Sequence, residues 1–181
     1  ERPSLTNLSP AEQAAIIESI RERRRAYAER FALQAEAERN GEQGVRVSDN
    51  DAFREHDAPA ISVIITLYNY QEYIQSCVQS LNEASLGAIP GGIEILIVDD
   101  ASTDQSLRQA RRAQSDSALP VRIIEKKFNT GLADARNVGL RRARAPYAFI
   151  MDADNLVFPA ALEQLYAAIV NSGAAAAYSI L

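Results

Sequence analysis

The sequence predicts an α/β domain with a mostly parallel central sheet, preceded by a long N-terminal helix. From about residue 58 onward, short runs rich in β-branched residues alternate with stretches of helical periodicity, which is the pattern of a parallel sheet covered by helices. Before that point, the residues from Pro10 to Arg39 include no glycine and no proline after the first position. With 181 residues, 47% hydrophobic and 24% charged, the chain has the composition of a compact globular protein.

The N-terminal helix has a strong start signal and a weak apolar face. Ser9 is suited to cap the helix, Pro10 to occupy its first position, and Glu12 to complete a capping box. The apolar residues of the segment 16–31 keep roughly helical spacing, but the charged run 21–25 interrupts the stripe. We therefore expect an appended helix that is largely exposed to solvent.

A polar segment separates this helix from the rest of the chain. Asn40 and Gly41 form a helix stop signal, and the residues from there to Pro59 are mostly polar and include two glycines. This composition predicts a linker or loop. The expected organisation is a helical extension with its linker over residues 1–57 and a domain over residues 58–181.

The domain is expected to contain four buried strands and four helices. The strands are expected over residues 61–66, 93–98, 121–125 and 147–151, which are short and rich in β-branched residues. The helices are expected over residues 74–81, 104–113, 132–143 and 160–170, where apolar side chains recur at helical spacing. Since strands and helices alternate, the strands should lie parallel and end at one common edge.

Polar residues follow three of the four predicted strands. They are Thr66 and Tyr68 at the end of the first strand, Asp99 and Asp100 after the second, and Asp152 and Asp154 after the fourth. Ligands of parallel sheets bind at this edge, and four carboxylates repel one another unless a cation or a donor-rich ligand lies among them. Each pair alone has a simpler explanation, since one of the first two aspartates is expected to cap the next helix and Asp-x-Asp often begins a turn. The combination predicts a metal or nucleotide site.

Four motifs at these positions resemble the donor-binding half of a family 2 glycosyltransferase. They are ISVIITLYN at residues 61–69, ILIVDDASTD at 95–104, NTGLADARNVGL at 129–140 and DAD at 152–154. The resemblance covers about residues 60–170, with the motifs in the family's order and spacing, and says nothing about residues 1–57. It implies the GT-A fold, a sandwich that binds nucleotide-diphosphate sugars, and an inverting, metal-dependent transfer.

The resemblance also implies roles for individual residues. Asp154 corresponds to the ligand of an Mn²⁺ or Mg²⁺ ion, Asp152 lies beside it near the ribose and the sugar, and Thr66 and Tyr68 surround the nucleoside. For Tyr68 the alternative is an ordinary half-buried aromatic residue. The chemistry agrees, because a departing diphosphate needs positive charge, and an ion held by carboxylates supplies it.

Asp99, Asp100 and Arg136 are also assigned to the donor site. The Asp100 carboxylate can accept the N3 hydrogen of uracil, which cytosine lacks, so the expected donor is a UDP-sugar. Arg136 could reach a phosphate, or it could pair with Asp134 or with an acid at a strand end.

The general base that inverting transfer needs is not identified in this sequence. Such a base is normally a carboxylate that takes the acceptor's proton, and after Asp154 the chain has only Glu163, which is expected to face away from the site. Lys126 and Lys127 are expected to be solvated. We expect a chain that binds the donor, transfers sugar poorly and stops short of an acceptor-binding half, with a glycan, lipid or protein as the unidentified acceptor.

Composition argues against several other classes. The net charge of -5 has the wrong sign for a nucleic-acid-binding protein. A single cysteine, Cys77, can form no internal disulfide, and with one histidine it cannot build a zinc site of nitrogen and sulfur ligands. No apolar run approaches the roughly 18 residues that span a bilayer, and the charged N-terminus is not signal-like. We expect a cytoplasmic protein without a transmembrane segment in this chain.

Other functions fit parts of the pattern. A response-regulator receiver domain shares the Ile-Val-Asp-Asp strand, but begins with it, and no Met-Pro-x-x-Asp-Gly run follows Asp152. A phosphatase of the haloacid-dehalogenase type would need threonine where Leu156 stands. Dinucleotide binding is excluded because no G-x-G-x-x-G follows a strand. A nucleotide-sugar-binding module without catalysis remains open.

Overall fold

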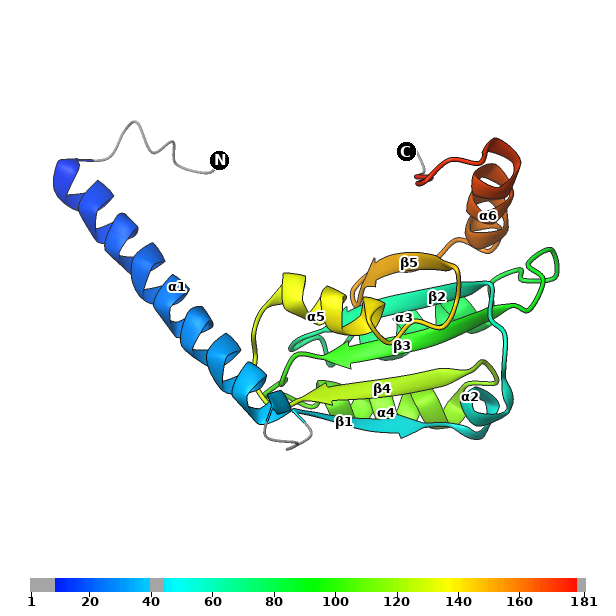
Figure 1. Ribbon diagram of the computed structural model, residues 1–181, viewed down its shortest axis with the longest axis horizontal. Helices are drawn as coiled ribbons and strands as arrows, with labels where there is room; N and C mark the ends of the chain where they lie inside the picture. The colour runs from blue at the N-terminus through cyan, green and yellow to red at the C-terminus, as the bar shows by residue number, and fades with distance from the viewer. Residues whose placement is uncertain (1–8, 40–43, 179–181) are drawn as a thin grey trace.

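The computed structural model describes residues 9–39 and 44–178 and has the predicted α/β architecture. Its elements in chain order are α1 (Pro10–Arg39), β1 (Val45–Asp49), α2 (Asp51–Glu55), β2 (Ile61–Leu67), α3 (Ile74–Asn82), β3 (Ile93–Asp99), α4 (Ser106–Asp116), β4 (Val121–Lys126), α5 (Leu132–Leu140), β5 (Tyr147–Asp152) and α6 (Ala161–Ser172). The strands of the described part form one sheet in the order β1-β4-β3-β2-β5. Strands β2 to β5 are parallel and β1 is antiparallel to β4, which confirms the predicted fold class (Figure 1).

The two faces of the sheet bury different residues because side chains alternate along a strand. Ile65 and Ile97 belong to one buried cluster, which includes residues of α3 and α4. Ile64 and Val98 belong to a second cluster with residues of α5. In Figure 1, α5 lies in front of the sheet and α3 and α4 lie behind it. Each strand from β2 to β5 begins at the predicted residue and ends one residue later than predicted.

Helix α1 spans the predicted residues and extends away from the sheet (Figure 1). Its capping box is formed, since Ser9 N donates to Glu12 Oε2 at 2.8 Å and Glu12 N donates to Ser9 Oγ at 3.4 Å. The apolar residues Ile17 and Phe31 are exposed, as the broken stripe predicts. The stop signal predicted at residues 40–41 lies outside the described part of the chain. Within residues 9–39 and 44–178, no helix has both the length and the low polarity that crossing a membrane requires.

The segment that was expected to be a linker contributes to the sheet. Residues 40–43 lie outside the described part, but β1 and α2 follow directly. Strand β1 pairs with β4, with Val45 opposite Lys126 and Asp49 opposite Arg122. The linker expectation is therefore wrong for these residues, and the sheet begins at Val45 rather than near residue 58.

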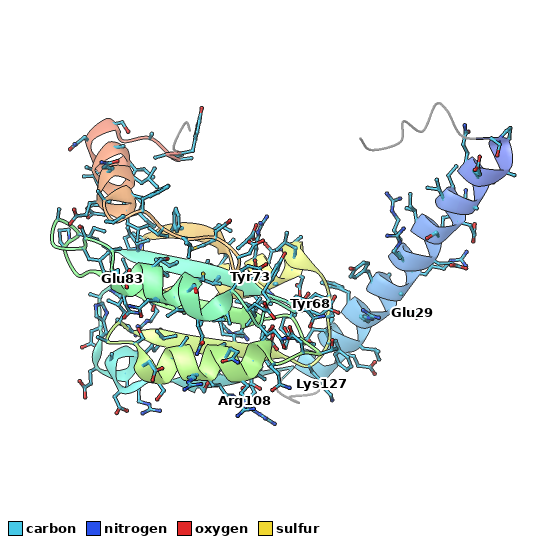
Figure 2. The ribbon with its side chains drawn as sticks, turned by 180° about the vertical axis from the view of Figure 1, so that it is seen from behind. Glu29, Tyr68, Tyr73, Glu83, Arg108 and Lys127 are labelled. Carbon is cyan, nitrogen blue, oxygen red and sulfur yellow. The ribbon has the colours of Figure 1, made fainter. Side chains whose placement is uncertain are left out.

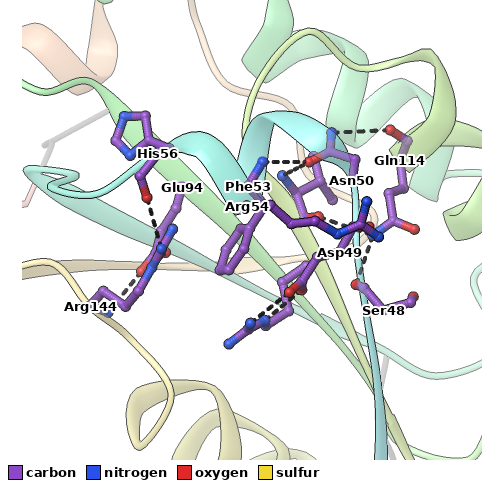
Figure 3. A network of polar contacts seen from close by, with 11 residues as sticks. Ser48, Asp49, Asn50, Phe53, Arg54, His56, Glu94, Gln114 and Arg144 are labelled. Carbon is purple, nitrogen blue, oxygen red and sulfur yellow. Dashed lines mark hydrogen bonds and ion pairs between the residues drawn. The ribbon is translucent and has the colours of Figure 1, made fainter.

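Side chains hold α2 and β1 in place (Figure 3). The Arg122 guanidinium contacts both carboxylate oxygens of Asp49 at 2.7 Å and lies 4.3 Å from the centre of the Phe53 ring. The guanidinium of Arg144 lies 4.0 Å from the same ring. Arg144 Nε also donates to the fully buried carboxylate of Glu94 at 2.6 Å. These contacts join α2 to β3, β4 and the residues before β5.

Candidate functional site

A cavity of about 310 Å³ lies at the carboxyl end of the sheet. Its lining includes the predicted site residues Thr66, Tyr68, Asp100 and Asp152, together with Gly131 before α5 and Tyr27 of α1. Figure 2 shows Tyr68 on the side of the domain to which the end of α1 attaches. The structure brings these four predicted residues to one cavity, and their roles stay predictions.

Strand register and side-chain alternation explain this convergence. Thr66 of β2 lies opposite Val98 of β3 and opposite Asp152 of β5. Thr66 and Asp100 come two positions after Ile64 and Val98, which pack with α5. Because strand side chains repeat every two residues, both polar residues lie on the α5 side of the sheet.

Asp152 connects three elements. Thr66 Oγ1 donates to Asp152 Oδ1 at 3.1 Å, and Arg136 Nη2 of α5 lies 3.0 Å from the same oxygen. The side chains of Arg136 and Asp152 are 38% and 41% exposed, and of the two only Asp152 is part of the cavity lining. Arg136 Nε is buried without a hydrogen-bond partner among the described residues. Of the two options for Arg136, the structure shows the pair with an acid at a strand end.

Asp100 is held by the loop that follows β4. Its Oδ1 accepts from Lys126 Nζ at 2.5 Å and from Thr130 N at 3.1 Å, and its Oδ2 accepts from Gly131 N at 2.8 Å. Gly131 has a φ of 93°, a conformation that favours glycine. Since each carboxylate oxygen can accept two hydrogen bonds, Oδ2 can accept another from a ligand.

Lys126 is buried, which corrects the expectation that it is solvated. Its side chain is 0% exposed and its Nζ lies 2.7 Å from Asp134 Oδ2. Burial opposes the ionisation of Asp134, but hydrogen bonds from Lys126 and Thr130, with the Lys126 charge, outweigh it and lower the pKa of Asp134. Lys127 is exposed, as expected.

Asp99 is not part of the cavity lining. Its side chain is 2% exposed and its Oδ2 accepts from Ser102 N at 3.3 Å. Burial raises the pKa of the Asp99 carboxyl, while the bond from Ser102 opposes this shift and the nearby charge of Asp100 adds to it. The surroundings of Asp99 therefore disfavour the charged form of its carboxyl group.

A different aspartate contacts the start of α4. Asp104 Oδ1 accepts from Ser106 N at 2.8 Å, and Asp104 Oδ2 accepts from Gln71 N at 3.3 Å. The expectation that Asp99 or Asp100 caps this helix is wrong. The residue at the N-cap position is Gln105, and the helix begins at Ser106, two residues later than predicted.

The loops after β2 and β3 are fixed to each other beside the cavity. Asn69 Oδ1 accepts from Thr103 N at 2.8 Å, and Asn69 N donates to Ser102 Oγ at 3.1 Å. Asn69 and Ala101 both have a φ of 58°, a left-handed conformation that is uncommon for residues with a Cβ. Such conformations persist where surrounding contacts hold them, often at functional sites.

The two acidic residues proposed for the metal lie in different surroundings. Asp152, the last residue of β5, is ion-paired with Arg136. Asp154 is exposed and has no hydrogen bond or ion pair with a described residue. Asn155 N donates to Asp152 O at 3.1 Å, so the chain turns directly after β5. Within the described residues, no group of three or more His, Cys, Asp or Glu side chains could hold a metal by itself. One or two carboxylates completed by substrate phosphates fit Mg²⁺ or Mn²⁺.

Glu163 of α6 is engaged outside the cavity. Its Oε1 accepts from Ala88 N at 2.8 Å, which ties α6 to the loop between α3 and β3. Its carboxylate therefore has a structural partner, in keeping with the expectation that it faces away from the site.

Sequence reasoning missed Tyr27 and misjudged Lys126. Tyr27 lies on α1, and nothing in the sequence identifies the residues against which this helix packs. For Lys126 a signal exists, because it follows buried Ile124 by two positions and must share its side of the sheet.

Comparison with known proteins agrees with this geometry. A sequence model of the family described as "Glycosyl transferase family 2" matches residues 62–180. A teichoic acid poly(glycerol phosphate) polymerase of Staphylococcus epidermidis is 35% identical over 95 residues, which are 52% of this chain and 13% of that protein. The glycosyltransferase GlyG of Streptococcus pneumoniae is 33% identical over 108 residues, which are 59% of this chain and 34% of that protein. The chain thus spans about a third or less of these relatives.

Solved structures with similar folds include two nucleotide complexes. Residues 1-349 of S. aureus TarS in complex with UDP superpose with a TM-score of 0.55 and 28% identity, over 61% of this chain and 32% of that one. The mannosyltransferase PcManGT of Pyrobaculum calidifontis, in complex with GDP-Man and Mn²⁺, gives a TM-score of 0.50 and 26% identity, over 72% and 37%. These likenesses agree with the expected GT-A fold.

Proposed function

Because this chain belongs to glycosyl transferase family 2, we propose that it is the donor-binding part of an enzyme that transfers a sugar from a UDP-sugar. The observation that carries the proposal is the cavity lined by Thr66, Tyr68, Asp100 and Asp152 at the carboxyl end of the sheet. The similar TarS structure holds UDP, which supports a uridine nucleotide here. The acceptor is a glycan, lipid or protein that the chain does not identify.

The proposed reaction moves one glycosyl group with inversion. An acceptor hydroxyl oxygen forms a bond to the anomeric carbon, and the bond from that carbon to the β-phosphate oxygen breaks. UDP leaves with the bonding electrons, and the hydroxyl proton passes to a base. The site must therefore stabilise the negative charge that develops on the diphosphate.

The base end of the donor is assigned to Asp100 and Tyr68. Asp100 Oδ2 has room for one more donor, and the N3–H of uracil is a group that a carboxylate recognises and that cytosine lacks. The bonds from Lys126, Thr130 and Gly131 fix the orientation of this carboxylate. Tyr68 is 42% exposed, so its ring is available to the nucleoside.

The phosphate and sugar end is assigned to Arg136, Asp152 and Asp154. The Arg136 guanidinium is partly exposed and its Nε has no partner within the described part of the chain, so it can bind a phosphate. Asp154, with Asp152 beside it, would hold an Mn²⁺ or Mg²⁺ ion, and such an ion supplies positive charge at the diphosphate. The similar mannosyltransferase structure contains Mn²⁺, which supports this assignment.

A nucleotide-sugar-binding module without catalysis is the second candidate. The bond from Ala88 N to Glu163 favours it, because this carboxylate is engaged away from the cavity. Transfer by this chain is therefore expected to be at least about a hundredfold below that of an enzyme with its base in place. A cytoplasmic location is part of the proposal, since the single cysteine, Cys77, is a buried free thiol.

Calorimetric titration with UDP, in EDTA and in millimolar Mn²⁺, tests the donor and metal assignments together. We expect binding in both conditions and tighter binding with Mn²⁺, because the ion joins the acidic residues to the diphosphate. Asp154→Ala should remove the effect of Mn²⁺ on UDP affinity. The control is Asp57→Ala, at an exposed aspartate between α2 and β2, which should keep this effect. Equal affinities in EDTA and Mn²⁺ would exclude the metal assignment, and absence of UDP binding would exclude the proposed function.

Competition between UDP and CDP tests the base contact. A buried acceptor that loses its donor costs about 1 to 3 kcal/mol, so UDP should bind about tenfold or more tightly than CDP. Asp100→Asn should narrow this ratio. If the ratio of UDP affinity to CDP affinity is unchanged in Asp100→Asn, Asp100 does not recognise the base.

A further inference from the structure

Helix α1 reaches the cavity through Tyr27. This side chain lines the cavity together with Tyr68 and Asp100. A Cβ placed on Gly131 would lie 3.5 Å from Tyr27 Cε1, so the ring lies close to the backbone of that loop. The ring is nevertheless 46% exposed. The family match begins at residue 62, so this contact comes from a part of the chain that the family does not describe.

The position of Tyr27 is fixed by contacts further along the helix. Gln34 lies about two turns after Tyr27 and so on the same face of α1. Its side chain is 4% exposed, and its Nε2 donates to Gly44 O at 2.9 Å. Lys127 N donates to the same Gly44 oxygen at 3.2 Å, which connects the end of α1 to the end of β4. The helix that carries Tyr27 is therefore tied to the strand that leads into the loop of Gly131.

Tyr27 lies at the end of the cavity that is assigned to the base. The loop residue it approaches, Gly131, donates its N–H to Asp100 Oδ2. Asp152, paired with Arg136, belongs to the phosphate and sugar end. A uracil whose N3–H points at Asp100 meets that carboxylate with its edge, which leaves the two faces of the ring for aromatic contacts.

We propose that Tyr27 stacks on the base of the bound UDP-sugar, so that α1 forms one wall of the donor site. The proposal rests on the proposed function, since it assumes a uridine nucleotide in this cavity. Tyrosine suits the task because its ring covers a base with little loss of conformational freedom. Helix α1 is then a binding element, and Tyr27 a donor-binding residue that lies outside the matched family region.

Tryptophan fluorescence gives a direct readout at this position. The chain contains no tryptophan, so Tyr27→Trp introduces a single fluorophore at the cavity. Uridine and UDP should both quench it to saturation, because each brings a base onto the ring, whereas inorganic pyrophosphate should not. Phe31→Trp, one turn further along α1 at an exposed residue outside the cavity lining, is the matched control and should not respond.

Calorimetry with the full chain gives the energetic readout. Tyr27→Ala should weaken UDP binding about tenfold, as expected for the loss of one stacked aromatic ring, whereas Tyr27→Phe and Phe31→Ala should bind as the unaltered chain does. Far-UV circular dichroism with thermal unfolding confirms that each variant is folded, which is expected because Tyr27 is exposed on a surface helix.

The outcomes separate this proposal from the proposed function. If the unaltered chain does not bind UDP, the proposed function fails and the stacking role fails with it. If the unaltered chain binds UDP but Tyr27→Ala binds equally well, only the role of Tyr27 is overturned. If the fluorescence of Tyr27→Trp does not change at saturating UDP, the stacking role of Tyr27 is overturned, whatever effect Tyr27→Ala has on the fold.

Discussion

Lys126 holds the loop after β4 against the end of β3. Its Nζ contacts Asp100 at 2.5 Å and Asp134 at 2.7 Å, and its side chain is fully buried. The Lys126 ammonium group, together with the backbone N–H groups of Thr130 and Gly131 that donate to Asp100, offsets the cost of burying these two carboxylates. The shape of the base end of the cavity therefore depends on this one lysine.

Lys126→Met is expected to lower the free energy of unfolding by about 3 to 5 kcal/mol, because it leaves buried carboxylates without their counter-charge. Urea unfolding measures the change. Lys127→Met is the control, since Lys127 is exposed and its ammonium lies 5.5 Å from the Phe128 ring centre, an interaction worth at most about 1 kcal/mol there. Equal losses in both variants would contradict the ion-pair account.

The burial of Lys126 could be predicted from the sequence, but its partners could not. Lysine is rarely buried, and an adjacent Lys127 favours a solvated pair, yet strand alternation puts Lys126 on the same side as buried Ile124. Its partners lie directly after β3 and on α5, so naming them requires the pairing of β3 with β4, which no local pattern contains. The contact of Tyr27 with the loop at Gly131 also joins distant parts of the chain, so no local pattern predicts it.

Asp99→Asn is expected to stabilise the chain at neutral pH. Burial raises the pKa of Asp99, so the folded state holds this proton more tightly than the unfolded state, and stability falls as the pH rises from the unfolded to the folded pKa. Asparagine cannot ionise, so the advantage of the variant should grow from pH about 4, near the ordinary aspartate pKa, to pH about 7. Urea unfolding at both pH values measures it. Asp116 is exposed, so Asp116→Asn is the control. An equal gain in stability in this variant would contradict the explanation by burial.

Helix α5 lies close to the sheet because glycine stands at its contact point. A Cβ on Gly139 would lie 2.4 Å from Ile64 Cγ2 and 3.3 Å from Val98 Cγ2. Ala135 and Val138 of the same helix are buried against the second face of the sheet. This approach brings the loop at Gly131 and the guanidinium of Arg136 to the carboxyl edge. The Ala- and Gly-rich face of the helix made the close packing predictable.

Gly139→Ala should destabilise the domain by about 1 to 3 kcal/mol, because the added methyl group overlaps Ile64 in a packed interior. Helix propensity alone predicts the opposite sign, with alanine favoured by about 1 kcal/mol, so the measured sign decides between packing and propensity. Chemical denaturation gives the value. Gly87→Ala serves as the control, since a Cβ there has no atom within 4 Å. A stabilising Gly139→Ala would mean that α5 lies further from β2.

The sequence predicts β2 to β5 almost to the residue, but not β1 or α2. The predicted strands are short runs in which apolar residues predominate, which is typical of buried parallel strands. Strand β1 is a short antiparallel edge strand, and of its residues only Val45 is buried. Its Val-Arg-Val alternation is too short to outweigh the surrounding polar residues. Its partner β4 lies far along the chain, so its role becomes visible only in the folded molecule.

At the scale of the whole molecule, the N-terminal region has two parts with different roles. Helix α1 leaves most of its apolar residues exposed and contacts the domain near Tyr27 and Gln34. Strand β1 and α2 are integral to the domain, because Asp49 and Phe53 are bound by arginines from β4 and from the segment before β5 (Figure 3). The functional boundary between extension and domain therefore falls between α1 and β1.

Two N-terminal truncations test this division. A chain without residues 1–39 should still unfold cooperatively, with a melting temperature within a few degrees of the full chain, because the sheet is complete. It should bind UDP more weakly, since Tyr27 is absent.

A chain without residues 1–50 also loses the pairing of β1 with β4, the contact of Asp49 with Arg122, and the bond that Asn50 Oδ1 accepts from Val121 N at 3.0 Å. The loss of these buried contacts, about 3 kcal/mol or more, should lower its melting temperature by about 10 °C. Calorimetric melting of both truncations measures the difference, and equal melting temperatures would show that β1 adds nothing to the stability of the sheet.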